Sequence, residues 1–162
     1  MKQKIIPLIL TILTVSSIMS QNLNFYDLRY DKVSLDTNKP HLLIFVSTNS
    51  CHNCYLEVEK YLESHNAYSH NRLNIVTVSF LQKNDLENIA VRKVFYNASK
   101  YYFPHIKMRL FSDEESYKIL FGKVIDEKTF PKIVLIDKNN VKIFEPYTEF
   151  INNTLFDQHE NE

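Results

Sequence analysis

The chain has 162 residues, with 19 basic and 19 acidic side chains, and 44% of its residues are hydrophobic. This length and composition fit one globular domain with a single core. The charges balance and form no long run of either sign, so we expect no nucleic-acid partner. A single glycine excludes the glycine-rich phosphate loops of nucleotide-binding proteins, and the sequence indicates no cofactor.

Residues 1–20 have the pattern of a secretory signal peptide. Lys2 and Lys4 precede an apolar stretch, Ile5 to Met19, that is short for a membrane span. Cleavage after Ser20 leaves residues 21–162 as the domain, with 17 basic and 19 acidic residues and a net charge of −2. We therefore expect an exported protein, periplasmic or secreted. A retained N-terminal anchor remains open, and it would be the chain's only contact with the membrane.

Several segments have strand patterns. Alternating apolar and polar residues from Tyr26 to Leu35, with a turn at Asp31-Lys32, predict a hairpin at the edge of a sheet. The apolar runs Leu42 to Val46 and Ile133 to Ile136 indicate strands covered on both faces. Ile75 to Phe80 is also strand-like. These strands predict one sheet that is buried by helices.

Helical spacing marks two longer segments. After Cys54, four apolar residues share one face: Tyr55, Val58, Tyr61 and Leu62. A second helix is predicted from Asp85 to Tyr102, ended by Pro104, with six residues at three- and four-residue spacing: Leu86, Ile89, Ala90, Val94, Ala98 and Tyr101. The remaining predicted elements are a strand at Lys107 to Phe111, a short helix with Tyr117, Leu120 and Phe121, a strand at Val141 to Phe144 that forms a hairpin through Asn139-Asn140, and a helix from Tyr147.

Cys51 and Cys54 are the chain's only cysteines, and they lie where an apolar strand passes into a helix. Helix N–H groups and the helix dipole stabilise a thiolate at such a position, so the pattern favours a redox-active dithiol. Two other interpretations use the same residues. One is a static disulfide. The other is half of a zinc site, but the six histidines are scattered without a ligand spacing, and we predict no metal site.

The order of these elements resembles the thioredoxin fold and, within it, the exported TlpA-like and ResA-like family. Residues 27–35 resemble its N-terminal hairpin, and Cys51 to Glu57 resembles its Cys-x-x-Cys-x-x-Glu signature. Asp85 to Tyr102 matches its extra helical connection, and Thr129-Phe130-Pro131 before residues 133–137 matches its cis-proline loop. The resemblance implies an α/β fold, with a central mixed β-sheet flanked by helices, an N-terminal β-hairpin and an extra helical connection.

The resemblance also implies an activity, thiol–disulfide exchange with protein thiols, and therefore two kinds of partner: substrate proteins and an electron-donor or electron-acceptor protein. Cys51 would be the exposed nucleophile, and Cys54 would release the mixed disulfide. His52, when protonated, would stabilise the Cys51 thiolate, and Glu57 would tune thiol acidity or assist proton movement. Each of these two supporting residues has an equally simple interpretation as a solvated surface side chain.

A substrate groove is expected beside the dithiol. By resemblance, Pro131 is cis, and a cis bond at this place exposes the preceding backbone for strand-like pairing with a bound peptide. Thr129 and Phe130 would then line the groove opposite Cys51. An ordinary trans proline at the start of a strand is the alternative.

Four departures from the family pattern stand near the cysteines. Ser50 replaces a common tryptophan, and Phe45 stands where relatives often carry a buried acidic or amide residue. His52-Asn53 lacks proline between the cysteines, and Glu59 replaces a frequent helix-kinking proline. Two further functions therefore remain open: a binding module without redox turnover, and a copper-handling protein that uses both cysteines and a histidine.

Overall fold

The structure is a computed structural model that describes residues 23–36, 38–48, 51–69, 73–122, 130–138, 140–153 and 155–156. The predicted signal segment, residues 1–20, lies outside the described residues. No helix among the described residues is long and apolar enough to span a membrane.

A seven-stranded mixed sheet forms the centre of the domain, in the order β2-β1-β5-β4-β3-β6-β7. The inner strands β3, β4 and β5 are parallel, and all other pairs are antiparallel. The predicted edge hairpin is present, since β1 and β2 form one edge of the sheet. The predicted turn at Asp31-Lys32 is wrong, because Lys32 pairs with Tyr26 and residues 27–31 connect the two strands. The strands are β1 (Phe25–Tyr26), β2 (Lys32–Val33), β3 (His41–Val46), β4 (Asn74–Phe80), β5 (Met108–Ser112), β6 (Lys132–Asp137) and β7 (Asn140–Phe144).

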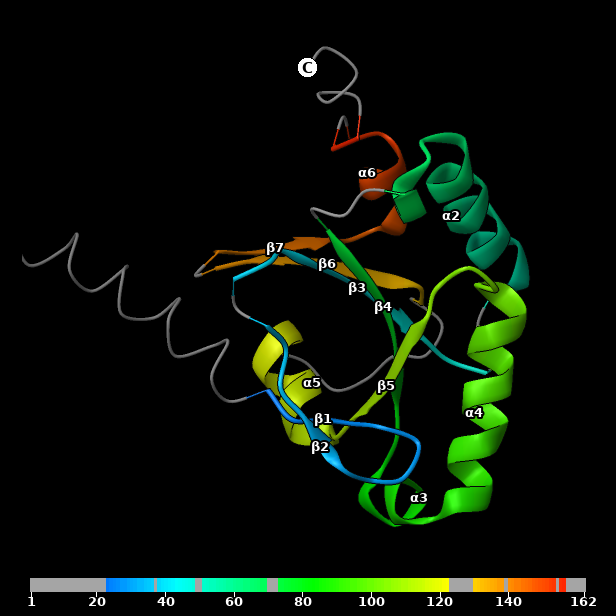
Figure 1. Ribbon diagram of the computed structural model, residues 1–162, viewed down its shortest axis with the longest axis vertical. Helices are drawn as coiled ribbons and strands as arrows, with labels where there is room; N and C mark the ends of the chain where they lie inside the picture. Colours follow the sequence, from blue (N-terminus) through cyan, green and yellow to red (C-terminus); the bar gives the residue numbers. More distant parts are fainter. Residues whose placement is uncertain are drawn as a thin grey trace, which may run out of the picture.

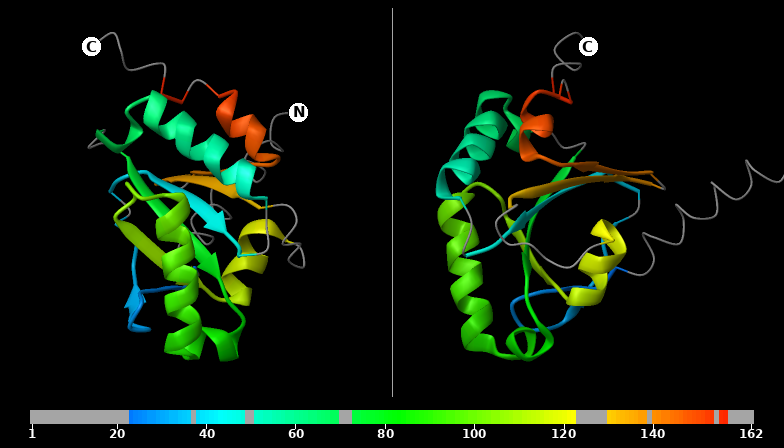
Figure 2. Two further views of the ribbon diagram at one scale, coloured as in Figure 1. Left: turned by 90° about the vertical axis from the view of Figure 1, so that its right-hand side faces the viewer. Right: turned by 180° about the vertical axis from the view of Figure 1, so that it is seen from behind.

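Helices cover both faces of this sheet. In Figures 1 and 2, α2, α4 and α6 lie on one side of the sheet, and α5 lies on the other. The helices are α2 (His52–Ser64), α3 (Lys83–Glu87), α4 (Ile89–Tyr102), α5 (Glu114–Phe121) and α6 (Tyr147–Ile151), with a 3-10 turn η1 (Ala67–Ser69) after α2. The short helix predicted around Tyr117 is α5, which ends at Gly122 in the left-handed conformation, with φ 62°. Glycine adopts this conformation at little cost.

The core is centred on β3, as the unbroken apolar run predicts. All six residues of this strand are buried, and four of them, Leu42, Leu43, Ile44 and Phe45, have no exposed surface. β3 pairs with β4 on one side and β6 on the other, so its backbone is bonded along both edges. The predicted apolar face of α2 is also confirmed, because Tyr55, Val58, Tyr61 and Leu62 are all buried. The sheet thereby holds the start of α2 against the middle of the domain.

The prediction of a single helix from Asp85 to Tyr102 is wrong in two respects. Asn88 has an extended backbone, with φ −89° and ψ 110°, and its side chain accepts a hydrogen bond from Ala90 N–H at 2.9 Å. This cap starts a new helix and separates α3 from α4. The buried face of α4 also differs from the predicted apolar face, because Val94 is 60% exposed and Tyr101 is 71% exposed.

Arg92 occupies the buried side of α4 in place of an apolar residue, and it is 3% exposed. Its Nε donates to the Leu28 carbonyl at 3.0 Å, and its Nη1 donates to the Leu86 carbonyl. The guanidinium also lies 5.3 Å from the centre of the Tyr30 ring. These contacts attach α4 to the segment between β1 and β2, and they satisfy a charge that would otherwise be costly to bury.

Candidate redox site

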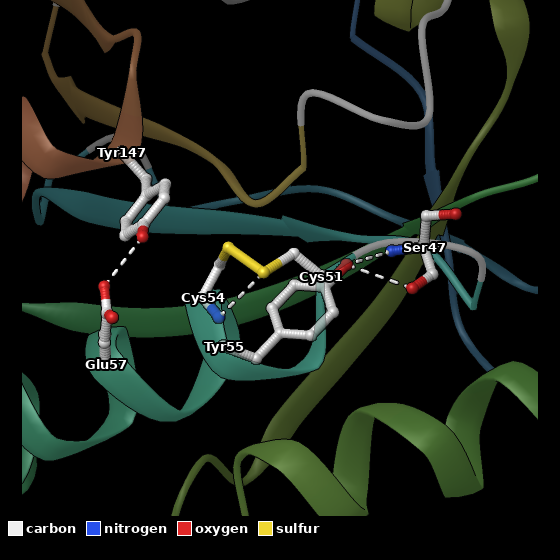
Figure 3. Close-up of a disulfide and its surroundings, with 6 residues drawn as sticks. All are labelled: Ser47, Cys51, Cys54, Tyr55, Glu57 and Tyr147. Atoms are coloured by element: carbon white, nitrogen blue, oxygen red, sulfur yellow. Dashed lines mark hydrogen bonds between the residues drawn. A yellow bond between two sulfur atoms is a disulfide. The ribbon is translucent and has the colours of Figure 1, made fainter.

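Cys51 and Cys54 form a disulfide at the start of α2, with their Cα atoms 5.3 Å apart. Cys51 is the N-cap of the helix, and its Sγ accepts a hydrogen bond from Cys54 N–H at 3.3 Å (Figure 3). A sulfur at this position faces the N–H groups that the first helical turn leaves without backbone partners. The predicted placement of the dithiol at a helix start is confirmed.

The two sulfur-bearing residues differ in accessibility. Cys51 is exposed, whereas Cys54 lies within the first turn and is partly buried. An incoming thiol or disulfide therefore has better access to Cys51. This asymmetry agrees with the predicted order of attack, in which Cys51 reacts first, but the order itself stays a prediction.

Tyr55 anchors the dithiol turn to the sheet. Its side chain is fully buried, and its hydroxyl accepts a hydrogen bond from Ser47 N–H at 2.7 Å and donates one to the Ser47 carbonyl at 3.0 Å. Ser47 directly follows β3, so these bonds join the end of a central strand to the first turn of α2 (Figure 3). The sequence placed Tyr55 on the apolar face of the helix and did not reveal the role of its hydroxyl.

Glu57, the predicted acidic helper, is held by α6. The Tyr147 hydroxyl donates a hydrogen bond to Glu57 Oε2 at 2.7 Å, and Figure 3 shows this pair beside the disulfide. The hydrogen bond to Glu57, with a smaller contribution from burial, raises the pKa of Tyr147 above its usual value. The carboxylate is exposed and one turn beyond Cys54. Its predicted role in proton movement stays a prediction.

His52, the other predicted supporting residue, lies against the end of α4. Its exposed ring is 5.3 Å from the Tyr102 ring and 6.2 Å from the Tyr101 ring, centre to centre. Tyr102 in turn contacts Tyr55 at 4.6 Å. The histidine therefore belongs to an aromatic group that connects α2 with α4 next to the disulfide.

The peptide bond between Phe130 and Pro131 is cis, as expected. Pro131 directly precedes β6, and Lys132 of β6 pairs with Phe45 of β3, so Pro131 lies at the end of the sheet from which the chain enters α2. Phe130 is 2% exposed and its ring lies 6.2 Å from the Tyr117 ring, and Pro131 is buried as well, so the predicted pairing of this backbone with a peptide stays a prediction. Thr129, the third predicted groove residue, lies outside the described residues.

Phe45, near the end of β3, is surrounded by aromatic rings. It stands where the family that the chain resembles often carries a buried acidic or amide residue. Phe45 has no exposed surface and packs edge-on against Phe121 at 5.3 Å and Tyr117 at 6.3 Å. Next to it lies a feature that the sequence did not reveal. Lys132 is 3% exposed, and its Nζ donates to Glu145 Oε1 at 2.8 Å and lies 5.1 Å from the Phe121 ring centre. The charge buried here is therefore an ammonium group with a carboxylate partner.

Metal-ligating side chains also gather away from the disulfide. Among the described residues, Glu59 and Glu63 of α2 lie with His105 so that one ligand atom from each is within 4.8 Å of the others. Glu59 is the residue that replaces the frequent helix-kinking proline. It is buried, and burial raises the pKa of its carboxyl group despite a hydrogen bond from Tyr68.

A comparison with protein-family models finds no match, and a comparison with curated protein sequences finds none either. Solved structures do match. A thiol:disulfide interchange protein of the thioredoxin family from Chlorobium tepidum has a TM-score of 0.50 at 16% identity, covering 75% of this chain and 81% of that one. A thioredoxin-like protein from Aeropyrum pernix has a TM-score of 0.50 at 13% identity, covering 74% and 78%. BsSco, a member of the Sco family of cytochrome c oxidase assembly proteins, has a TM-score of 0.51 at 16% identity, covering 83% and 85%.

These structures are 13–16% identical to this chain, and their likeness confirms the predicted thioredoxin fold. The predicted α/β architecture is present, with its mixed sheet and N-terminal hairpin, and the helical connection between β4 and β5 is divided into α3 and α4. The chain therefore has the thioredoxin-like fold, with its Cys51-x-x-Cys54 pair joined in a disulfide.

Proposed function

We propose that this protein is an exported thiol–disulfide oxidoreductase that acts on protein thiols and disulfides. The observation that carries the proposal is the Cys51–Cys54 disulfide at the start of α2, with the Cys51 side exposed. A disulfide that closes so short a loop constrains the unfolded chain little, so stability alone is a poor reason for placing the only two cysteines here.

The chemistry follows from the two unequal sulfurs. In the reducing direction, the Cys51 thiolate attacks a substrate disulfide, forms a mixed disulfide, and releases one substrate thiolate, which takes up a proton. Cys54 then loses its proton and attacks Cys51, which forms the internal disulfide and releases the second substrate thiol. Two electrons and two protons pass to the substrate. The oxidising direction reverses each step, and the reduction potential decides which direction dominates.

Peptide binding would use the backbone before Pro131. This segment lies at the same end of the sheet as the chain's entry into α2, and a substrate strand paired to it would bring its cysteine toward Cys51. Because Phe130 and Pro131 are both buried, this loop would have to become exposed for backbone pairing, and the exposed side chains beside the dithiol, such as His52 and Tyr101, would add contacts. Main-chain pairing suits an enzyme that accepts several protein substrates.

The partners of the protein would be substrate proteins and an electron-donor or electron-acceptor protein of the same compartment. The proposal that the protein is exported rests on residues 1–20. The support is the basic and apolar pattern of that segment. Fractionation of cells that express the full chain, with the N-terminus of the product determined by mass spectrometry, tests it. Recovery of uncleaved chain in the cytosol would refute export.

The exchange activity is tested with three proteins. Oxidised wild type is incubated with a reduced peptide, and reduced wild type with a disulfide peptide; we expect exchange faster than by a free dithiol in at least one direction. Cys54→Ser should accumulate mixed disulfides through Cys51 in cell-envelope extracts, because resolution needs the second sulfur. The matched control, Cys51→Ser, should accumulate far fewer, since Cys54 is less exposed. Binding of peptide without exchange or adducts would instead support a redox-inactive module.

A further inference from the structure

We propose that Glu59, Glu63 and His105 form a binding site for a divalent transition-metal ion of the zinc class. The site is separate from the dithiol and does not depend on the proposed redox function. Glu59 and Glu63 are four residues apart on α2, so they share one face of the helix, and His105 follows the end of α4. One ligand atom from each residue lies within 4.8 Å of the others.

The strongest observation is the environment of Glu59. This side chain is 6% exposed, and its Oε1 is buried without any hydrogen-bond partner. Its Oε2 accepts a hydrogen bond from the Tyr68 hydroxyl. A buried carboxylate with one unsatisfied oxygen is costly, and a cation bound at that oxygen would offset the cost. The protein already supplies an aromatic hydroxyl that fixes the other oxygen, as outer partners of metal-bound carboxylates do.

The spacing of the other two ligands fits a small metal ion. His105 Nε2 and Glu63 Oε1 are 3.2 Å apart. In a tetrahedral zinc site, with bonds of about 2.0–2.1 Å, neighbouring ligand atoms are separated by roughly 3.3 Å. The ion pair therefore already has nearly the separation of two ligands on one metal. Two carboxylates and one imidazole would leave the fourth position to water, as in zinc sites with three protein ligands.

Arg109 is the charged group that opposes a cation here, because it is close enough to interact electrostatically with Glu59. Its terminal nitrogens are directed elsewhere: Nη2 donates to the Phe103 carbonyl at 2.8 Å and Nη1 to the Lys107 carbonyl at 3.4 Å. Its Nε is buried without a partner. The competing arrangement is a water molecule between this Nε and Glu59 Oε1, with no metal. Even with Arg109 counted, the two carboxylates leave the cluster with a negative charge, which favours a divalent cation.

The test uses the full mature protein in its oxidised form, because the disulfide prevents Cys51 and Cys54 from binding metal. Zn²⁺ is titrated calorimetrically into chelator-treated protein, and Co²⁺ is used as a spectroscopic probe of coordination geometry. We expect one saturable Zn²⁺ site and the strong visible absorption of four-coordinate Co²⁺. Loss of a ligand in Glu63→Gln or His105→Ala should weaken Zn²⁺ binding by at least about tenfold.

These two variants carry the test because both side chains are about half exposed and are not needed for the core. The matched controls are Glu114→Gln, an exposed helical glutamate paired with Lys118 at i,i+4, and His52→Ala, an exposed histidine beside the disulfide. Both should bind Zn²⁺ like the wild type. Absence of saturable binding, or equal binding by Glu63→Gln, His105→Ala and the wild type, would refute the site and leave the water-bridged arrangement.

Discussion

The two hydrogen bonds of the Tyr55 hydroxyl make a sharp prediction about stability. The change is Tyr55→Phe, which removes one oxygen atom and keeps the ring and its contacts with Tyr102 and Phe103. The hydroxyl is bonded to both backbone groups of Ser47, at 2.7 and 3.0 Å, in a fully buried setting. The substitution therefore isolates these polar bonds from the packing of the aromatic ring.

The magnitude follows from the number of bonds. A buried hydrogen bond contributes a net of about 0.5–1.5 kcal/mol, so the loss of two should lower the free energy of unfolding by about 1–3 kcal/mol. For a domain of this size, each kcal/mol corresponds to roughly 4 °C in melting temperature, so we expect a decrease of about 4–12 °C. The matched control is Tyr101→Phe, whose ring is 71% exposed. Its effect should stay within about 0.5 kcal/mol.

Denaturant unfolding of the oxidised and reduced proteins measures the effect, and it also gives a redox readout. By the thermodynamic cycle, any difference in cost between the two redox states appears as a change in reduction potential, with 1.4 kcal/mol corresponding to about 30 mV. A larger cost in the oxidised form would make the potential more positive. If Tyr55→Phe unfolds like Tyr101→Phe in both states, the hydroxyl does not anchor the dithiol turn and the reasoning is refuted.

Two other predictions concern reactivity and pH. In the reduced protein, limited alkylation followed by mass spectrometry should label Cys51 before Cys54, because Cys51 is exposed and caps the helix; faster labelling of Cys54 would reverse the assigned roles. Burial lowers the pKa of His41 in the folded protein. The unfolded chain therefore binds a proton on this side chain at a higher pH than the folded protein does. The free energy of unfolding should fall as the pH drops from about 6.5 through the lowered pKa of the folded state. His41→Gln should reduce this loss, measured as unfolding free energies at about pH 7.5 and 5; an equal loss in both proteins would contradict it.

Local patterns in the sequence were sufficient for much of the fold. A strand that is paired on both edges and covered on both faces is made of apolar residues, so the apolar run at Leu42 to Val46 indicated a central strand. The structure places this run in β3, between β4 and β6. The two cysteines at a strand–helix boundary, and the proline before the next apolar strand, indicated which parts of the chain meet. Each of these signals is carried by residues that are close together in sequence.

The features that the sequence did not reveal depend on partners far along the chain. Arg92 is buried in α4 because it bonds to the Leu28 carbonyl, 64 positions away, and no helical periodicity contains that information. The metal-ligating cluster was missed for the same reason, since His105 has no ligand spacing with any neighbour in sequence. The break at Asn88 had a local signal, an asparagine able to cap a helix, but the apolar spacing on both sides favoured a continuous helix.

The surroundings of the dithiol also bear on how the mixed disulfide is resolved. Within the proposed function, Cys54 must lose a proton before it attacks, and Phe45 stands in the sequence where the family that the chain resembles often carries a buried acid. Glu57 is the exposed carboxylate one turn beyond Cys54, and its Oε2 accepts a hydrogen bond from the Tyr147 hydroxyl. The Phe45 side chain cannot accept this proton, so within the proposed function we expect solvent to accept it and the mixed disulfide to be longer-lived.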